Sequence, residues 1–455
     1  MTHSLYNHKY ILGISFISAL GGYLFGFDFA VIAGALPFLR ATFALSSWWE
    51  GFLTGSLALG CIAGCVIAGT LADRFGRKPG LIMAALIFGS SSIGMALAPS
   101  LTFFIALRFL AGIGVGMASL LSPMYIAEIS PANIRGRNVA INQLTIVVGI
   151  LVTNIVNYTL SAKGAEAWRW MFGLGCIPSG LFLLGLIWLP ESPRWLVKAD
   201  QHLKAENVLN KIGNPIYVES TLSDIKASFS GSAIKQTYSS VLAKNIRPVV
   251  LIGITLAVFQ QLCGINVVFN YTSTIFKSLG ASLNEQLFET VAIGAVNLAF
   301  TIIAMWQVDK LGRKPLMLFG SIGLAILYII LALLLKNHSA TIWGSITVLA
   351  AISVYSMTLA PVTWVLISEI FPNKIRGLAS SVAIVSLWLA YFILVFTFPV
   401  LVEKLGTYGP FWMYSVICVL GFLFIKYKVK ETKGKTLEEL EGYGNKVDAS
   451  LNIIH

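Results

Sequence analysis

Long apolar segments alternate with short polar ones along the whole chain. An α-helix needs about 20 apolar residues to cross the hydrocarbon core of a membrane, because each residue rises by about 1.5 Å. Twelve segments reach that length: 9–38, 48–72, 79–99, 101–130, 138–160, 169–189, 246–277, 285–309, 315–336, 339–370, 377–402 and 409–429. The pattern predicts an all-α membrane protein with twelve transmembrane helices, six in each half of the chain.

The polar loops of the first half recur in the second half. Asp73-Arg74-Phe75-Gly76-Arg77 has its counterpart in Asp309-Lys310-Leu311-Gly312-Arg313. Offsets of 236, 241 and 240 residues separate three pairs of acids: Asp73 and Asp309, Glu128 and Glu369, Glu191 and Glu431. Nearly equal offsets indicate an internal duplication, and duplicated membrane proteins of this kind are usually transporters. We therefore expect two pseudo-symmetric six-helix bundles.

A polar interruption separates the two halves. It divides the chain into an N-terminal six-helix bundle at 1–190, a cytoplasmic linker at 191–247, a C-terminal six-helix bundle at 248–430 and a cytoplasmic tail at 431–455. The linker places apolar residues among charged ones: Leu203, Val208, Leu209 and Ile212. That spacing predicts short amphipathic helices lying against the cytoplasmic face.

The composition agrees with lipid contact, since 56% of the residues are hydrophobic and 11% are charged, whereas soluble domains carry about 25% charged residues. Most of the 32 Lys and Arg fall on the side that carries both termini, so the positive-inside rule puts both termini in the cytoplasm. The net charge of +12 therefore reflects topology and gives no reason to expect nucleic acid. We expect a multi-pass protein of the plasma membrane, the inner membrane of a bacterium.

Asp28 and Arg108 are the only acid and the only base well inside a predicted span, and they lie at similar depth. A charged side chain there costs about 2–3 kcal/mol on insertion scales, so it normally has a partner and a function. We infer that the two pair. The arginine favours the ionised carboxylate while burial opposes it, so a movement that separates them can load or release a proton. A purely stabilising salt bridge is the alternative.

Uncharged amides lie near the middle of several predicted spans. They are Gln143, Gln260, Gln261, Asn266 and Asn297. Amides both donate and accept hydrogen bonds, which suits vicinal hydroxyl groups, and Gly264 permits the local helix break that transporter sites often use. Aromatic rings that could cover a sugar ring are available from Phe25, Trp364 and Trp388. Hydrogen bonding between helices is the alternative role for the amides.

Acids and bases gather at the predicted cytoplasmic ends of the helices. In the first half they are Asp73, Arg77, Glu128, Arg135 and Glu191, and in the second half Asp309, Arg313, Glu369, Arg376 and Glu431. We expect Asp73 to pair with Arg77 and Glu128 with Arg135, and their copies likewise. Networks across the two halves would hold the cytoplasmic side shut and break when it opens. Solvated charges that only set the topology are the alternative.

Several motifs resemble those of the sugar porter family of the major facilitator superfamily, over almost the entire chain. They are Asp73-Arg74-Phe75-Gly76-Arg77, Pro190-Glu191-Ser192-Pro193-Arg194, Phe259-Gln260-Gln261 and Glu431-Thr432-Lys433-Gly434-Lys435. The resemblance implies two bundles around a cavity that opens alternately to either side. It implies sugar contacts for the amides and aromatic rings named above, and it matches Asp28 to the proton-coupling aspartate and Arg108 to its partner. Asn270 departs from the most similar members, which have a tyrosine there.

These observations favour a proton-coupled symporter that imports a monosaccharide by alternating access. The sugar stays open between a pentose such as xylose and a hexose such as glucose. A facilitative uniporter is the alternative, and a non-transporting sugar receptor is a remote one. We expect no enzyme, because the sequence shows no nucleophile–base pair, and no cofactor or metal site. The expected partners are the sugar, the proton and lipid, with the protein as a monomer.

Overall fold

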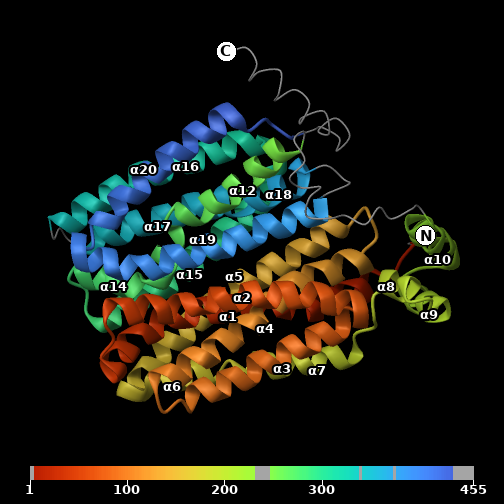
Figure 1. Ribbon diagram of the computed structural model, residues 1–455, viewed down its shortest axis with the longest axis horizontal. Coiled ribbons are helices and arrows are strands. Elements are labelled where there is room, and N and C mark those ends of the chain that lie inside the picture. The colour runs from red at the N-terminus through yellow and green to blue at the C-terminus, as the bar shows by residue number, and fades with distance from the viewer. Residues whose placement is uncertain (1–4, 231–245, 338–340, 372–375, 434–455) are drawn as a thin grey trace. The chain divides into compact units, whose positions relative to one another are not determined.

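The computed structural model describes residues 5–230, 246–337, 341–371 and 376–433, apart from the side chains of 228–230, 308–309, 341, 368–369 and 376–377. Helices dominate these residues (Figure 1). The helices of the first half are α1 (His8–Phe43), α2 (Ser47–Phe75), α3 (Arg77–Ala96), α4 (Leu101–Ile129), α5 (Arg135–Leu160), the 3₁₀-helix η1 (Ser161–Glu166), α6 (Ala167–Gly173), α7 (Cys176–Trp188), α8 (Pro193–Lys198), α9 (His202–Ile212) and α10 (Pro215–Ser230). Those of the second half are α12 (Arg247–Leu262), α13 (Ile265–Asn270), α14 (Thr272–Ser278), α15 (Leu283–Leu311), α16 (Arg313–Lys336), α17 (Thr341–Met357), α18 (Leu359–Ile370), α19 (Arg376–Leu405) and α20 (Gly409–Lys428).

The described helices account for the predicted membrane spans. Eleven helical stretches are long and apolar enough to cross a membrane. One of them runs for 54 residues from Arg135 to Trp188, more than twice the roughly 20 residues that one crossing needs. Gly164 interrupts it with a φ of 75°, so α5 makes one crossing and α6 with α7 makes another. The prediction of twelve transmembrane helices is confirmed.

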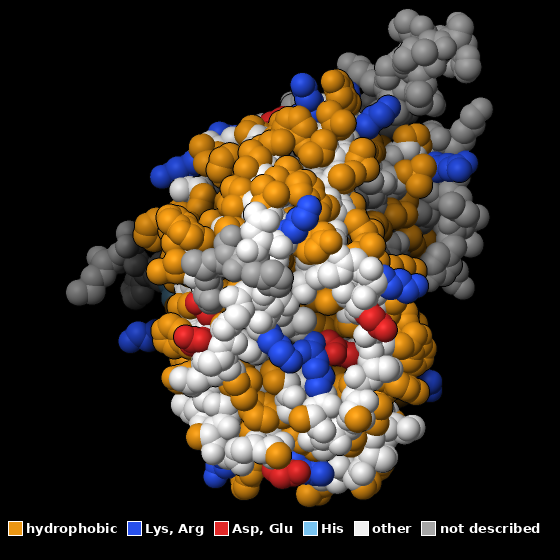
Figure 2. Space-filling view, turned by 90° about the vertical axis from the view of Figure 1, so that its left-hand side faces the viewer, with side chains coloured by type: hydrophobic (Ala, Val, Ile, Leu, Met, Phe, Trp, Pro, Cys, Tyr) orange, Lys and Arg blue, Asp and Glu red, His pale blue; other side chains and the backbone are white. Residues whose placement is uncertain are grey.

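Hydrophobic side chains lie beside polar and charged ones on the face seen in Figure 2. On α7, Leu184, Ile187 and Trp188 are exposed, as are Ile326 and Ile330 on α16. Large apolar side chains that face outward along helices of this length are stable only against lipid tails.

The chain forms two compact units. The first contains residues 1–38 and 56–234, and the second contains 39–55 and 235–455. The turn between α1 and α2, within residues 39–55, therefore belongs to the second unit, although most of both helices belongs to the first.

The two units use the same hydrogen bonds at corresponding positions. In the first unit the Ser179 hydroxyl of α7 donates to the Ala85 carbonyl of α3 at 2.6 Å. In the second unit the Ser415 hydroxyl of α20 donates to the Ala325 carbonyl of α16 at 2.9 Å. The α3–α7 pair and the α16–α20 pair are therefore joined in the same way, as expected for an internal duplication.

Glycines let the helices of the first unit pack closely. A Cβ atom on Gly112 of α4 would collide with the Leu57 carbonyl of α2, and one on Gly116 would collide with the Cys61 carbonyl. A Cβ on Gly114 would come within 2.8 Å of the Ala84 carbonyl of α3. Small residues allow this close approach. It matters because helices in a bilayer associate mainly through van der Waals packing, since lipid tails are as apolar as the side chains and leave no hydrophobic driving force between helices.

Two spans of the second unit are broken. α12 ends at Leu262, Gly264 has a φ of 89°, and α13 begins at Ile265, so the break expected at Gly264 is present. A second break at Thr358, between α17 and α18, was not expected. Pro361 explains it, because a proline has no N–H to donate to the preceding turn.

Short helices follow the sixth span. On α9 the buried face consists of Ala205, Val208, Leu209 and Ile212, which recur at intervals of three and four residues. The placement of Leu203 on this face was wrong, since that side chain is 78% exposed. Two residues before Ala205, it points to the opposite side of the helix.

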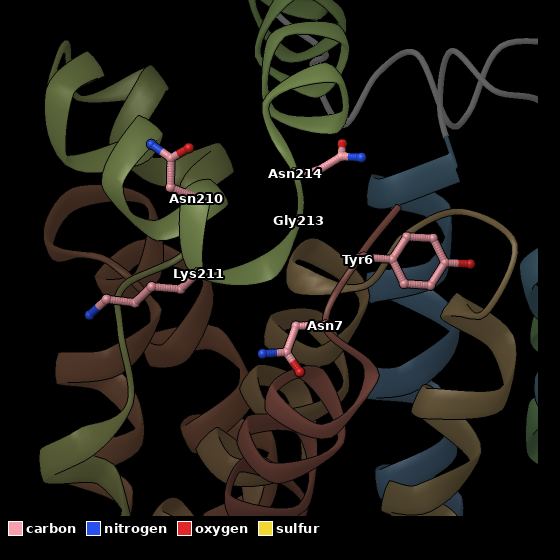
Figure 3. A pocket seen from close by; sticks show the side chains of 6 residues that line it. All are labelled: Tyr6, Asn7, Asn210, Lys211, Gly213 and Asn214. Atoms are coloured by element: carbon pink, nitrogen blue, oxygen red, sulfur yellow. The ribbon is translucent and has the colours of Figure 1, made fainter. Parts of the chain in front are cut away.

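The N-terminal segment is bound to these helices. The Asn7 N–H donates to the Ile212 carbonyl at 2.7 Å, and the Asn214 N–H donates to the Leu5 carbonyl at 3.0 Å. A shallow polar pocket lies beside this bridge (Figure 3), lined by Tyr6, Asn7, Asn210, Lys211, Gly213 and Asn214.

Candidate functional site

Asp28 and Arg108 lie together in the interior of the first unit. Asp28 comes from α1 and Arg108 from α4, and 3.7 Å separates Asp28 Oδ1 from Arg108 Nη1. Each side chain is 1% exposed. The structure therefore brings together the acid and the base whose pairing the sequence suggested.

The carboxylate of Asp28 is held by charge rather than by hydrogen bonds. Within the parts of the chain that the structure describes, neither of its oxygens accepts a hydrogen bond, and 3.7 Å exceeds hydrogen-bond length. The Arg108 guanidinium also lies 5.6 Å from the centre of the Phe172 ring, a distance at which the ring face attracts a cation. Asp28 can therefore gain a proton without first breaking a hydrogen bond to the protein.

Six polar side chains of the second unit, together with the backbone carbonyl of one of them, Asn266, form a series of hydrogen bonds. The Gln260 side-chain amide donates to the Tyr355 hydroxyl at 2.6 Å, and the Gln261 side-chain amide donates to Gln260 Oε1 at 2.7 Å. The Asn266 amide donates to the side-chain oxygen of Gln261. The chain continues through Asn270 to Tyr391, described below.

This chain gathers three of the predicted sugar ligands at the Gly264 break. Gln260 and Gln261 lie in the last turn of α12, and Asn266 lies in the first turn of α13. Because α13 starts again after Gly264, its first turn brings the Asn266 side chain back to Gln261. Each amide keeps hydrogen-bonding capacity beyond the bonds of the chain.

The other predicted ligands of the second unit vary in exposure. The Asn297 side-chain oxygen accepts a hydrogen bond from the Ser356 hydroxyl at 2.7 Å. Trp388 is buried, with 6% of its surface exposed, whereas Trp364 is 44% exposed. An exposed indole on a transmembrane helix faces either lipid or a water-filled cavity, and only the second would let it contact a sugar.

Phe25 and Gln143 belong to the first unit. Phe25 is half-buried and meets Phe29 edge to face, with 6.1 Å between ring centres. Gln143 is exposed on α5. That these two residues face one cavity with the amides of the second unit stays a prediction.

The charged residues at the helix ends of the first half have partners that differ from those expected. Arg77 binds Glu128, with 2.7 Å between Nη2 and Oε1, and Asp73 binds Lys198 at 2.9 Å. The expected pairing of Asp73 with Arg77 was wrong because α2 ends at Phe75 and Gly76, with a φ of 102°, turns the chain into α3. The expected partner of Glu128, Arg135, is exposed at the start of α5.

Glu191 and Glu431 accept hydrogen bonds from the first backbone N–H groups of two corresponding helices. Glu191 accepts from Arg77 at 3.0 Å and from Lys78 at 3.1 Å. Glu431 accepts from Arg313 and from Lys314, both at 3.0 Å. A carboxylate at a helix N-terminus satisfies N–H groups and favours the helix dipole. Both acids therefore bind within their own unit.

The two carboxylates differ in their acidity. Burial raises the pKa of Glu191 above its usual value, although backbone N–H groups of Ser192, Arg77 and Lys78 oppose this. For Glu431 burial acts in the same direction, but four backbone N–H groups outweigh it and the pKa is lowered. The side chains of Asp309, Glu369 and Arg376 lie outside the described residues, and a network across the two halves stays a prediction.

Sequence reasoning missed a second ion pair, between Arg40 and Glu50. Arg40 Nε donates to Glu50 Oε2 at 2.5 Å, and the same guanidinium donates to the Thr274 hydroxyl at 2.5 Å. Glu50 is only 6% exposed. The signal was available, since opposite charges stand on the two sides of the short turn between the first two spans.

Comparison with known proteins identifies the family. Residues 14–442 match the family described as Sugar (and other) transporter. A D-xylose-proton symporter of Escherichia coli is 39% identical over 475 residues, covering 96% of this chain and 96% of the relative. A glucose transport protein of Synechocystis is 39% identical over 463 residues, covering 96% of this chain and 98% of the relative.

A solved structure of a relative also matches this chain. A structure of a major facilitator superfamily proton:xylose symporter bound to 6-bromo-6-deoxy-D-glucose matches with a TM-score of 0.81 at 39% identity, covering 96% of this chain and 100% of the other. The match extends over nearly all helices of both chains. This protein therefore belongs to the sugar transporter family of the major facilitator superfamily.

Proposed function

We propose that this protein is a proton-coupled symporter that imports a monosaccharide by alternating access. The relatives it resembles include a D-xylose-proton symporter, a glucose transport protein and an arabinose-proton symporter. The substrate class is a neutral aldopentose or aldohexose, carried unchanged and without chemistry. We place the protein in a bacterial plasma membrane, with both termini in the cytoplasm and the monomer as the working unit.

The observation that carries the proposal is the Asp28–Arg108 pair. Two opposite charges at 3.7 Å, both 1% exposed, attract each other strongly in a medium of low dielectric constant. Protonation of Asp28 cancels that attraction and leaves Arg108 held by the Phe172 ring face. α1 and α4 then no longer hold each other by charge, so the protonation state of Asp28 can bias the arrangement of the bundle.

Membrane voltage supplies enough energy for the coupling. One proton moving through 100 mV releases about 2.3 kcal/mol, and about 1.4 kcal/mol corresponds to a tenfold ratio. One proton per sugar would therefore sustain roughly 50-fold accumulation of a neutral solute.

The amide chain supports a polyhydroxylated, uncharged substrate. Gln260, Gln261 and Asn266 present amide donors and acceptors side by side in a buried setting. Vicinal hydroxyl groups match such a row, because each hydroxyl also donates and accepts. An ionic substrate would leave a buried charge without a counter-charge, which is costly.

Transport in proteoliposomes tests the proposal. The purified protein should accumulate a labelled sugar above its external concentration when an inward proton gradient is imposed, and a protonophore should reduce this to equilibration. Asp28→Asn should abolish accumulation but retain exchange of labelled for unlabelled sugar, because Asn cannot be deprotonated. Glu166→Gln, which alters an exposed acid, is the matched control and should accumulate sugar normally. Equilibration at every pH by the unaltered protein would identify a uniporter and falsify the proposal.

A further inference from the structure

The Asn270 side chain connects two helices of the second unit. Asn270 is the last residue of the short helix α13, which follows the break at Gly264, and it is 1% exposed. Its side-chain N–H donates to the Asn266 carbonyl at 2.6 Å. Its side-chain oxygen accepts from the hydroxyl of Tyr391 on α19 at 3.2 Å. Asn270 therefore links α13 to a long helix far away in the sequence.

The hydrogen bonds of the complete chain all run in one direction. From first donor to last acceptor the order is Tyr391, Asn270, Asn266, Gln261, Gln260 and Tyr355. Asn270 donates to the backbone carbonyl of Asn266, and Asn266 donates onward through its side chain. From Asn266 to Gln260, each bond fixes which end of the next side-chain amide donates. The Tyr391–Asn270 bond thus turns the Asn270 N–H toward the backbone of Asn266, the residue whose side chain begins the series of predicted sugar ligands.

Tyr391 also contacts the aromatic part of the site. Its ring meets that of Trp388 edge to face, with 5.8 Å between the centres. Tyr391 is 2% exposed and Trp388 is 6% exposed, so neither ring can swing away without disturbing its neighbours. One residue therefore touches both the series of amides and the indole expected to cover the sugar ring.

We propose that Asn270 and Tyr391 are a specificity-determining positioning pair for the sugar. The pair acts through other residues: it holds the backbone of Asn266, and with it the side chain that donates to Gln261, at a set distance from the Trp388 ring. This inference rests on the proposed function, because it names the residues that decide how sharply the same site discriminates between hydroxyl patterns. Both residues lie in the second unit.

Discrimination between a sugar and its monodeoxy analogues is the readout. In the unaltered protein, loss of a hydroxyl that meets an oriented amide leaves that amide unpaired and lowers affinity. When the amides can reorient, the penalty shrinks because they find other partners. Tyr391→Phe should therefore reduce the affinity ratio of sugar to deoxy analogue by about fivefold, the size expected for one hydrogen bond.

The experiment measures Kd for D-xylose, D-glucose, L-arabinose and the monodeoxy analogues of the sugar that binds best. The variants are Tyr391→Phe, Asn270→Ala and the double variant. Asn270→Ala also removes the bond to the Asn266 carbonyl, so it should lower the ratio at least as far as Tyr391→Phe does. The double variant should have the same ratio as Asn270→Ala, because the bond that Tyr391→Phe removes is then already absent. Tyr328→Phe is the matched control. That phenol is also fully buried and has no hydrogen bond among the described residues, so its loss should leave the ratio unchanged.

Two failures can be told apart. If the unaltered protein binds none of the sugars, the proposed function fails. If it binds a sugar but Tyr391→Phe and Asn270→Ala weaken the sugar and its deoxy analogues equally, the pair has only a structural role and the inference is overturned. Additive effects of the two variants on the ratio would overturn it as well. Binding needs no proton gradient, so the result is independent of the coupling mechanism.

Discussion

Arg108 lies 3.7 Å from Asp28, and the contact is an ion pair without a hydrogen bond. Such a contact keeps two charges together, and a proton that reaches either carboxylate oxygen has no protein hydrogen bond to displace. The consequence is that the arginine, and not a set of fixed donors, decides how readily Asp28 is ionised.

Arg108→Gln should therefore uncouple transport. Without the positive charge, a carboxyl group this deeply buried stays neutral, because an uncompensated buried charge is costly. We expect sugar exchange to persist, accumulation to fall to equilibration, and sugar affinity to lose its dependence on pH. Counterflow and accumulation in proteoliposomes measure these properties. Arg247→Gln, an exposed arginine at the start of α12, serves as the control, and accumulation retained by Arg108→Gln would contradict the account.

The stabilities of Glu191 and Glu431 variants should respond to pH in opposite directions. The pKa of Glu431 is lowered in the folded protein, so its contribution is present above the usual pKa of 4.5 and is lost as the pH falls further. The difference in Tm between the unaltered protein and Glu431→Gln should therefore shrink on acidification.

The contribution of Glu191 to stability depends on pH in the opposite direction. Its pKa is raised in the folded protein, so its stabilising contribution is complete below the usual pKa of 4.5 and declines as the pH rises through the folded value. The Tm of the unaltered protein, relative to that of Glu191→Gln, should therefore rise as the pH falls. Thermal unfolding in detergent between pH 4 and about 7 separates the two cases, and parallel curves for both variants would refute the assignment.

Gly312→Ala should destabilise the second unit. Gly312 has a φ of 90°, and an added Cβ would approach Glu431 Oε2 to 2.9 Å. The left-handed conformation alone costs a residue with a side chain about 1–2 kcal/mol, and displacement of Glu431 would expose the N-terminus of α16. We expect a lower Tm. Gly180→Ala, at a site with no atom within 4 Å of the added Cβ, is the control and should not lower Tm.

Removal of one member of the Arg40–Glu50 pair should cost more than removal of both. Glu50 is buried beside Arg40, whose guanidinium also binds Thr274. Arg40→Ala leaves the carboxylate without its counter-charge, at a cost of about 3 kcal/mol. In the Arg40→Ala/Glu50→Gln double variant that charge is gone, and part of the lost Tm should return. A double variant less stable than either single one would show that the ion pair is not the reason.

The sequence by itself determined the twelve spans, the duplication and the break at Gly264. The reason is that a helix in lipid must satisfy its hydrogen bonds within its own segment, so hydropathy and a glycine or proline suffice to locate it. The depth of Asp28 and Arg108 could be read in the same way, and with it their pairing. The break at Thr358 had a local signal in Pro361.

Only the tertiary structure decided which side chains meet when they lie far apart in the chain. Arg77 binds Glu128 instead of Asp73 because Gly76 turns the chain between α2 and α3. Tyr391 reaches Asn270 across 121 residues, a contact that no local pattern encodes. Helix packing sets such contacts through the rotation and approach of whole helices, which depend on every glycine and bulky side chain along the interface at once.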